Sequence, residues 1–147
     1  MAILNDGYQT TITFTSSQIS SGVTISNIME EKEVPPPGIA GGGAIDTTSM
    51  RNSAWRTAAA KSLKSLQPIT LVVAYDPDLY DEMINMVNDN QEITITFPDG
   101  STLVFWGFVD EFVPNALTEG EQPTANVTIV PTNKDDSGSE TAPVYTP

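Results

Sequence analysis

The chain has 147 residues, a formal net charge of −13 and a sequence pI of about 4.1, and 39% of its residues are hydrophobic. This length is typical of one domain that buries a core without disulfides or metal, and the excess of acids argues against tight nucleic-acid binding, which depends on Lys and Arg. Without Cys and His, the chain lacks thiol chemistry, the usual general base and the commonest metal ligand.

Two segments near the start of the chain predict β-strands. In residues 8–16 and 22–29, apolar residues alternate with Thr, Ser and Asn, which is the period of a strand with one buried face. The polar residues 16–21 between them predict a turn.

Residues 30–66 change in character and predict a long loop. Three consecutive prolines and three consecutive glycines lie within residues 35–43, and no apolar periodicity survives there. A loop of this length in a compact domain is usually functional or disordered. Residues 58–64 could be helical by composition, and the positions of Leu63 and Leu66 leave this question open.

The middle of the chain predicts a buried strand followed by a helix. Residues 68–75 include a continuous apolar run, Asp76 can cap a helix, and Pro77 suits its first position. An apolar stripe follows at helical spacing, consisting of Leu79, Met83 and Val87, with Tyr80 and Ile84 beside it. Residues 88–90 end the helix.

The second half predicts a hairpin and a closing strand. Residues 92–97 and 102–109 alternate like strands, and the Pro-Asp-Gly-Ser turn at 98–101 joins them. Residues 124–130 predict the last strand. The sum is a mainly β domain over residues 1–133, with the helix covering one side of a sheet. Residues 134–147 are rich in Asp, Ser, Gly and Pro and predict a flexible C-terminal tail.

Charge is strongly segregated along the chain. Residues 51–64 carry four bases and no acid, whereas residues 65–133 carry eleven acids and no base. A chain whose parts differ in sign can bind a copy of itself head to tail. Trp55 lies within the basic segment, where an aromatic could stack on nucleic-acid bases or anchor a protein interface, and the net charge favours the interface. The predicted subunit-interface residues are Arg51, Trp55, Arg56, Lys61 and Lys64.

No residue pattern points to catalysis. The acids of residues 76–82 are explained by a helix start, and the spacing of carboxylates matches no EF-hand. The triple glycine lacks the Gly-Lys-Ser/Thr ending of a phosphate-binding loop. Phe105, Trp106 and Phe108 suit sheet packing better than a sugar-binding platform. We therefore expect no catalytic residue, no cofactor and no metal site.

Nothing in the sequence predicts a membrane or secretion role. No apolar run approaches the roughly 18–20 residues that span a bilayer. The first residues lack the basic and apolar regions of a secretory signal. We expect a protein that is made and used in the cytoplasm, or that leaves the cell by another route.

The order of motifs over residues 71–107 carries a resemblance. The segment LVVAYDPDLYDEMINMVNDNQEITITFPDGSTLVFWG contains a strand, an Asp-Pro helix, a strand, a Phe-Pro-Asp-Gly turn and a strand that continues at its end as Phe-Trp-Gly-Phe over residues 105–108. It resembles the major tail tube proteins of long, non-contractile-tailed (siphovirus-like) bacteriophages. The resemblance extends over about residues 8–133, including Ile-Asp-Thr-Thr at 45–48 and the strand at 124–131.

The resemblance implies a β-sandwich flanked by one helix, with residues 30–66 as an inter-subunit loop. It implies a structural virion protein, not an enzyme, whose hexameric rings stack into the tail tube and line a negative channel for DNA. The implied partners are further copies of the chain and the tape measure, terminator and distal tail proteins, with DNA passing unbound. The implied location is the virion tail, with assembly in the host cytoplasm. Lumen-facing candidates are the strand-end acids Glu92, Asp110 and Glu111.

Two other readings remain open. One is a related tail terminator or head–tail joining protein, which forms a single ring and stops. The other is an Ig-like or carbohydrate-binding β-sandwich module, which would use Trp106, Tyr75 or Trp55 as its platform. An enzyme is the least supported class, because the chain offers no convincing nucleophile–base pair.

Overall fold

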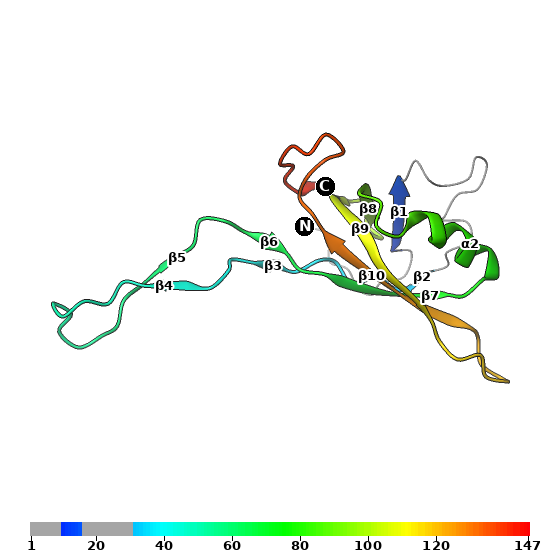
Figure 1. The fold of residues 1–147 in the computed structure, drawn as a ribbon, viewed down its shortest axis with the longest axis horizontal. Coiled ribbons are helices and arrows are strands. Elements are labelled where there is room, and N and C mark those ends of the chain that lie inside the picture. Colours follow the sequence, from blue (N-terminus) through cyan, green and yellow to red (C-terminus); the bar gives the residue numbers. More distant parts are fainter. Residues whose placement is uncertain (1–9, 16–30) are drawn as a thin grey trace.

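The computed structural model describes residues 10–15 and 31–147, so the predicted turn at 16–21 and strand at 22–29 lie outside the described residues. The fold is mainly β, with a single α-helix in the described ranges (Figure 1). The elements in chain order are β1 (Thr11–Thr15), β2 (Glu31–Glu33), β3 (Ile39–Ala40), β4 (Ala44–Asp46), β5 (Ala58–Ala60), β6 (Ser65–Leu66), β7 (Ile69–Ala74), α2 (Pro77–Met86), β8 (Gln91–Thr96), β9 (Thr102–Pro114), β10 (Thr124–Pro131) and β11 (Val144–Thr146).

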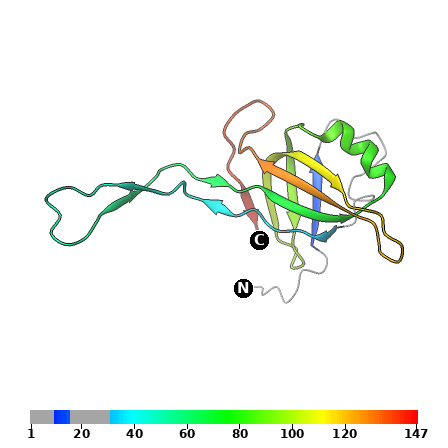
Figure 2. The same ribbon diagram turned by 60° about the horizontal axis from the view of Figure 1, so that its bottom comes forward.

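One antiparallel sheet forms the body of the molecule. Its strand order is β1-β8-β9-β10-β7-β2, and β11 adds to β9. The sheet curls so that β1 and β8 cross behind β7 and β10, while α2 lies beside it (Figure 2). Buried residues from both halves of the curled sheet and from α2 belong to one hydrophobic core. The expected sandwich-like β fold with one helix is therefore confirmed.

The core follows from alternation along paired strands. In β8, Ile93 and Ile95 are fully buried, and the register pairs them with the buried Phe14 and Ile12 of β1. Because side chains of a strand alternate between its two faces, the Thr residues between them point to the opposite face. The predicted strands at 8–16, 68–75, 92–97 and 124–130 correspond to β1, β7, β8 and β10 within the described residues.

The helix begins and ends as its sequence predicts. The Asp76 side chain accepts a hydrogen bond from the Asp78 N–H, and Pro77 occupies the first turn. The capping Val87 N–H donates to the Met83 carbonyl, and Asn88 follows in the left-handed region at φ 68°. The Asn88 N–H donates to the Val109 carbonyl, which attaches the end of the helix to β9. The face of α2 turned to the core consists of Leu79, Glu82, Met83 and Met86.

Strand β9 continues to Pro114, beyond the predicted end at residue 109, and contains a β-bulge. Ile129 of β10 pairs with Val109, but the preceding Thr128 pairs with Glu111, which leaves Asp110 as an extra residue. The extra residue reverses the alternation, so Phe112 returns to the core side, where it pairs with the buried Val127. Strict alternation would instead have turned Glu111 to the core.

Residues 39–66 form a long hairpin rather than an irregular loop. Two short antiparallel ladders, β3–β6 and β4–β5, hold the two sides of the hairpin together. We call this hairpin the arm. It extends away from the body on the side opposite α2 (Figures 1 and 2). The question left open for residues 58–64 is thereby answered, because Ala58–Ala60 is the strand β5. Three consecutive exposed alanines show no alternation of apolar and polar residues, so the sequence alone does not predict this strand.

The C-terminal segment carries more structure than the flexible tail expected for residues 134–147. Its strand β11 pairs with β9, with Val144 opposite Val104 and Thr146 opposite Thr102. The Asp135 carboxylate accepts the backbone N–H groups of Ser137 and Ser139 and so closes a tight turn. All three residues of β11 are exposed, which explains why no apolar alternation marked them.

Candidate assembly surfaces

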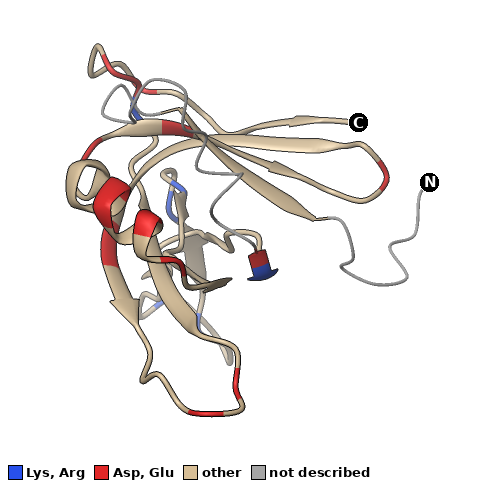
Figure 3. Ribbon diagram, turned by 90° about the vertical axis from the view of Figure 1, so that its right-hand side faces the viewer, with Lys and Arg blue, Asp and Glu red and all other residues tan. Residues whose placement is uncertain are grey.

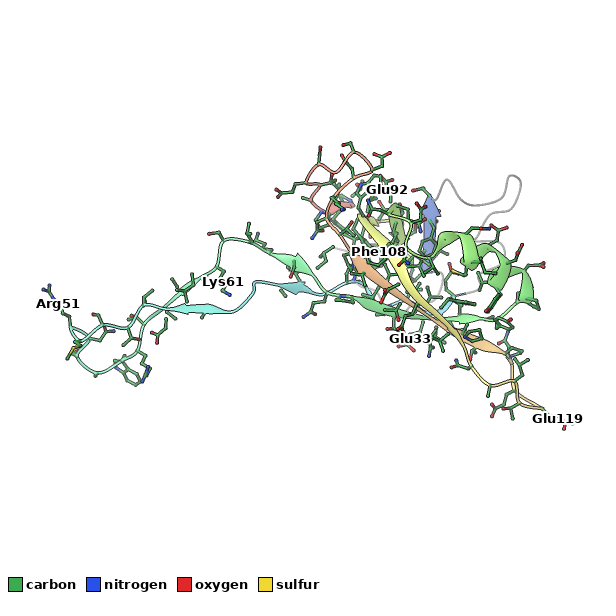
Figure 4. All side chains as sticks on the ribbon, viewed as in Figure 1. Glu33, Arg51, Lys61, Glu92, Phe108 and Glu119 are labelled. Atoms are coloured by element: carbon green, nitrogen blue, oxygen red, sulfur yellow. The ribbon has the colours of Figure 1, made fainter. Side chains whose placement is uncertain are left out.

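The arm places all five predicted interface residues in solvent. Figure 4 shows Arg51 at the far tip and Lys61 farther back along the arm. Trp55 is 84% exposed, and Met50, next to Arg51, is fully exposed. The structure brings Arg51, Trp55 and Arg56 together in the tip (residues 47–57), whereas Lys61 and Lys64 lie nearer the body.

The tip is held in shape by polar side chains. The Asn52 side chain accepts from the Ser49 N–H at 3.0 Å and donates to the Trp55 carbonyl at 2.8 Å. At the neck of the tip, the Thr57 N–H donates to the Thr48 hydroxyl at 3.0 Å. These bonds hold the tip in a defined conformation although it buries almost no apolar surface.

The charges of the tip are weakly engaged within the chain. Arg56 forms an ion pair with Asp46 at 3.7 Å, but the two side chains are 86% and 66% exposed, so the pair contributes little stability. Hydrogen bonds from Thr48 hold the pKa of Asp46 below its ordinary value. Asp46 is the single acid of residues 39–66, and the tip therefore remains a net positive surface.

The end opposite the arm is acidic. Figure 3, viewed from that end, shows acids on α2 and on the hairpin between β9 and β10. Glu119 in this hairpin and Arg51 in the arm lie at opposite ends of the molecule (Figure 4). The charge segregation read from the sequence is therefore also a segregation in space.

Sequence reasoning missed a groove between α2 and β9. A hollow of about 260 Å³ is lined by Tyr80, Met83, Ile84, Val87, Asp110 and Phe112, and we call it the α2–β9 groove. Tyr80 meets Phe112 edge-on and Tyr75 stacks on the same ring. Ile84 remains 67% exposed at its rim. The i, i+4 spacing of Tyr80 and Ile84 was visible in the sequence, but the bulge that aims Phe112 at the helix was not.

The three acids expected to face a lumen do not share one surface. Glu92 pairs with Trp106, on the sheet face opposite the buried pair Ile93 and Phe105. Glu111 pairs with Thr128. The adjacent pair, Phe112 and Val127, points to the core, so Glu111 lies on the same outer face as Glu92. We call this surface the outer sheet face. Asp110 instead lines the α2–β9 groove, since the bulge sets it beside the helix.

In the described part of the chain, no group of three His, Cys, Asp or Glu residues could hold a metal ion. None of the described helices is long and apolar enough to cross a membrane. Phe105 is a core residue, 1% exposed, whereas Trp106 is half-buried on the outer sheet face beside Glu92.

Comparison with known proteins gives structural relatives only. No protein-family profile and no curated protein sequence matches the chain. The fold is similar to a chain in the 6-fold symmetrised cryo-EM structure of the anti-feeding prophage (AFP) baseplate, with a TM-score of 0.69 and 7% identity, covering 99% of this chain and 97% of that one. It is also similar to a chain in the C6-symmetric tail of an empty GTA particle, with a TM-score of 0.62 and 14% identity, covering 98% of this chain and 100% of that one. The chain thus shares its fold, over nearly its whole length, with chains of two sixfold particles.

Proposed function

We propose that the protein is a structural subunit that self-assembles into hexameric rings, which stack as the tube of a phage-type tail. The observation that carries this proposal is the whole-length likeness to chains of two particles with sixfold symmetry, one of them a tail. The sequence resemblance to siphovirus-like tail tube proteins, read independently of the fold, supports the same function. The tube would be a passage for DNA and would perform no reaction.

The arm supports an assembling protein over a monomeric binding module. It projects from the body (Figure 1), and its residues Met50 and Trp55 are exposed. Exposed large apolar residues on an ordered projection are typical of partner contacts. A carbohydrate-binding module has no use for such a structure. In the assembly, Arg51, Trp55 and Arg56 would contact a neighbouring subunit, and Lys61 and Lys64 would line the same contact nearer the body.

The outer sheet face is the surface that suits a DNA channel. It carries Glu92 and Glu111 among Thr residues of β8 and β10, and the described part of the chain places no Lys or Arg on these strands. Negative charge repels phosphates, so DNA would slide along such a surface without binding. We assign Glu92 and Glu111 to the lumen. Asp110 is left out of this assignment, because it lies beside α2.

A second candidate is a related subunit that forms one ring and does not stack. The likeness to a chain in a 6-fold symmetrised baseplate structure, beside the one in a tail, favours it. Both candidates require self-association through the arm, and they differ in whether rings continue to add. The location in both cases would be the virion tail, with assembly in the host cytoplasm beside other tail proteins.

Sedimentation velocity of the purified protein over a concentration series tests the proposal. We expect large assemblies whose abundance rises with concentration, and an Arg51→Glu variant that remains monomeric and folded by circular dichroism. Lys134→Glu changes the net charge equally but lies outside the arm, so this variant should assemble like the wild type. Monomers at every concentration, or equal loss in both variants, would overturn the proposal.

A further inference from the structure

The α2–β9 groove and the arm tip have complementary surfaces. The groove presents apolar Ile84 and Tyr80, which are 67% and 48% exposed. The tip presents apolar Met50 and Trp55, of which Trp55 is 84% exposed. Surface apolar side chains of this size on two ordered elements of one chain suit an anchor and its receiving site.

The charges around these apolar residues are opposite in sign. Asp110 lines the groove, and Asp81 lies three residues before Ile84 on the exposed side of the helix. Neither carboxylate forms an ion pair with any described residue. Arg51 and Arg56 flank the apolar residues of the tip. A basic, apolar tip therefore matches an apolar groove with acidic edges.

The arm cannot occupy the groove of its own chain. It leaves the body from the side opposite α2, and its tip is the part of the chain farthest from the helix in both views (Figures 1 and 2). A contact between tip and groove is therefore a contact between two copies. This contact joins the tip of one copy to the groove of another. In such a pair, one copy keeps its groove available and the other keeps its tip available, so the contact can repeat along a series of copies.

We propose that the arm tip of one copy docks in the α2–β9 groove of a second copy. Trp55 and Met50 cover the exposed side chains of Ile84 and Tyr80 in the groove. Arg51 and Arg56 then approach Asp81 and Asp110. This inference rests on the proposed self-assembly and adds the receiving site of the arm.

Disulfide trapping tests the docking directly, because the chain has no cysteine of its own. The test variant carries Met50→Cys in the tip and Ile84→Cys in the groove. The matched control carries Met50→Cys with Leu117→Cys, a position that is 69% exposed on the acidic β9–β10 hairpin. Oxidation of the concentrated protein should give a ladder of dimers, trimers and longer chains from the test variant, and only dimers linked through like positions from the control.

The two double variants separate docking in the groove from other contacts of the arm. Equal ladders from both would show a contact that is not specific to the groove and would overturn the proposal. A ladder from the test variant, absent in the control and in each variant with a single substitution, supports the docking. A ladder from the control alone would assign the arm to the hairpin and overturn the proposal. The absence of a ladder from both double variants would also overturn it.

Charge exchange gives a second, independent test. One variant reverses the tip (Arg51→Glu with Arg56→Glu), and another reverses the groove (Asp81→Lys with Asp110→Lys). Each alone should lose assembly, with the concentration needed for half-assembly raised at least about tenfold. A mixture of the two should assemble again, because the acidic tip of one fits the basic groove of the other. Folded variants that fail to co-assemble would contradict the docking.

Failure of this inference and failure of the proposed function give different results. Hollow sixfold tubes from wild type and groove-reversed variant alike would overturn the docking and leave the tube. Cross-linked chains without any closed ring in electron micrographs would support the docking and overturn the ring-forming function.

Discussion

Tyr80 of the helix meets Phe112 of β9 edge-on, with their ring centroids 5.9 Å apart. Phe112 also stacks against Tyr75, with ring centroids 6.3 Å apart. The Phe112 ring therefore connects β9 to the helix through Tyr80 and to the end of β7 through Tyr75. The contact exists because the bulge at Asp110 turns Phe112 toward the core side of the sheet. The same bulge therefore builds the floor of the α2–β9 groove.

Replacing Phe112 with Ala should weaken the attachment of the helix. The side chain is half-buried, so we expect a loss of about 2 kcal/mol in the free energy of unfolding, below the range for a fully buried Phe. Chemical denaturation followed by circular dichroism measures this loss. Val113→Ala removes an exposed neighbour and should change the free energy by less than about 0.5 kcal/mol. Equal effects of the two changes would contradict the role of the aromatic contact.

Gly107→Ala should destabilise the sheet through a clash. A Cβ at this position would lie 2.8 Å from the Val130 carbonyl oxygen, which is backbone and cannot rotate away. Overpacking of this kind costs about 1–3 kcal/mol, measurable as a lower midpoint in denaturant. Gly41→Ala meets nothing within 4 Å and has no left-handed backbone, so it serves as the control and should be neutral or slightly stabilising. A neutral Gly107→Ala would show that β9 and β10 can separate without cost.

Stability should fall in acid partly through the hairpin turn at Asp99. Hydrogen bonds from Ser101 lower the pKa of Asp99, so the folded state favours the ionised carboxyl. The stabilisation is full above the ordinary carboxyl pKa and is lost as pH falls through the lowered value. Between about pH 6 and pH 3, the melting temperature of the wild type should fall more than that of Asp99→Asn. Parallel curves for the two proteins would contradict this assignment.

Removing residues 142–147 should leave a folded protein of lower stability. The deletion takes away β11, whose exposed residues pair with the start of β9 but bury little. We expect one cooperative thermal transition at a reduced temperature. The β9 amides that face β11 should exchange faster with deuterium, while those of β8 should not change. Loss of the cooperative transition would show that the tail belongs to the core.

The parts of the fold that sequence could predict are those with a local physical signature. A continuous apolar run identified β7, alternation identified β8, and Asp76 with Pro77 marked the start of α2. The strands of the arm could not be predicted because they are short and exposed, as the three alanines of β5 are. Only their pairing in the folded chain defines them. The sequence did not predict the bulge. Its position is set by the register between β9 and β10, and the sequence of one strand alone does not reveal that register.

The candidate surfaces divide in the same way. Charge placed the predicted subunit interface in residues 51–64, and the structure locates this segment on the arm. The groove depends on residues far apart in sequence, since Ile84 and Phe112 meet only after the helix packs on β9. The surface on which an acid lies also depends on the register of its strand, because Asp110 and Glu111 are neighbours in sequence that lie on different surfaces.

Electron microscopy of the concentrated protein tests the central claim most directly. The account predicts hollow assemblies whose end-on class averages have sixfold symmetry and whose side views show stacked rings. An arm-shortened variant, with residues 41–64 replaced by a short turn, should remain a folded monomer and form neither rings nor tubes. Monodisperse monomers of the wild type at every concentration and salt would contradict the account.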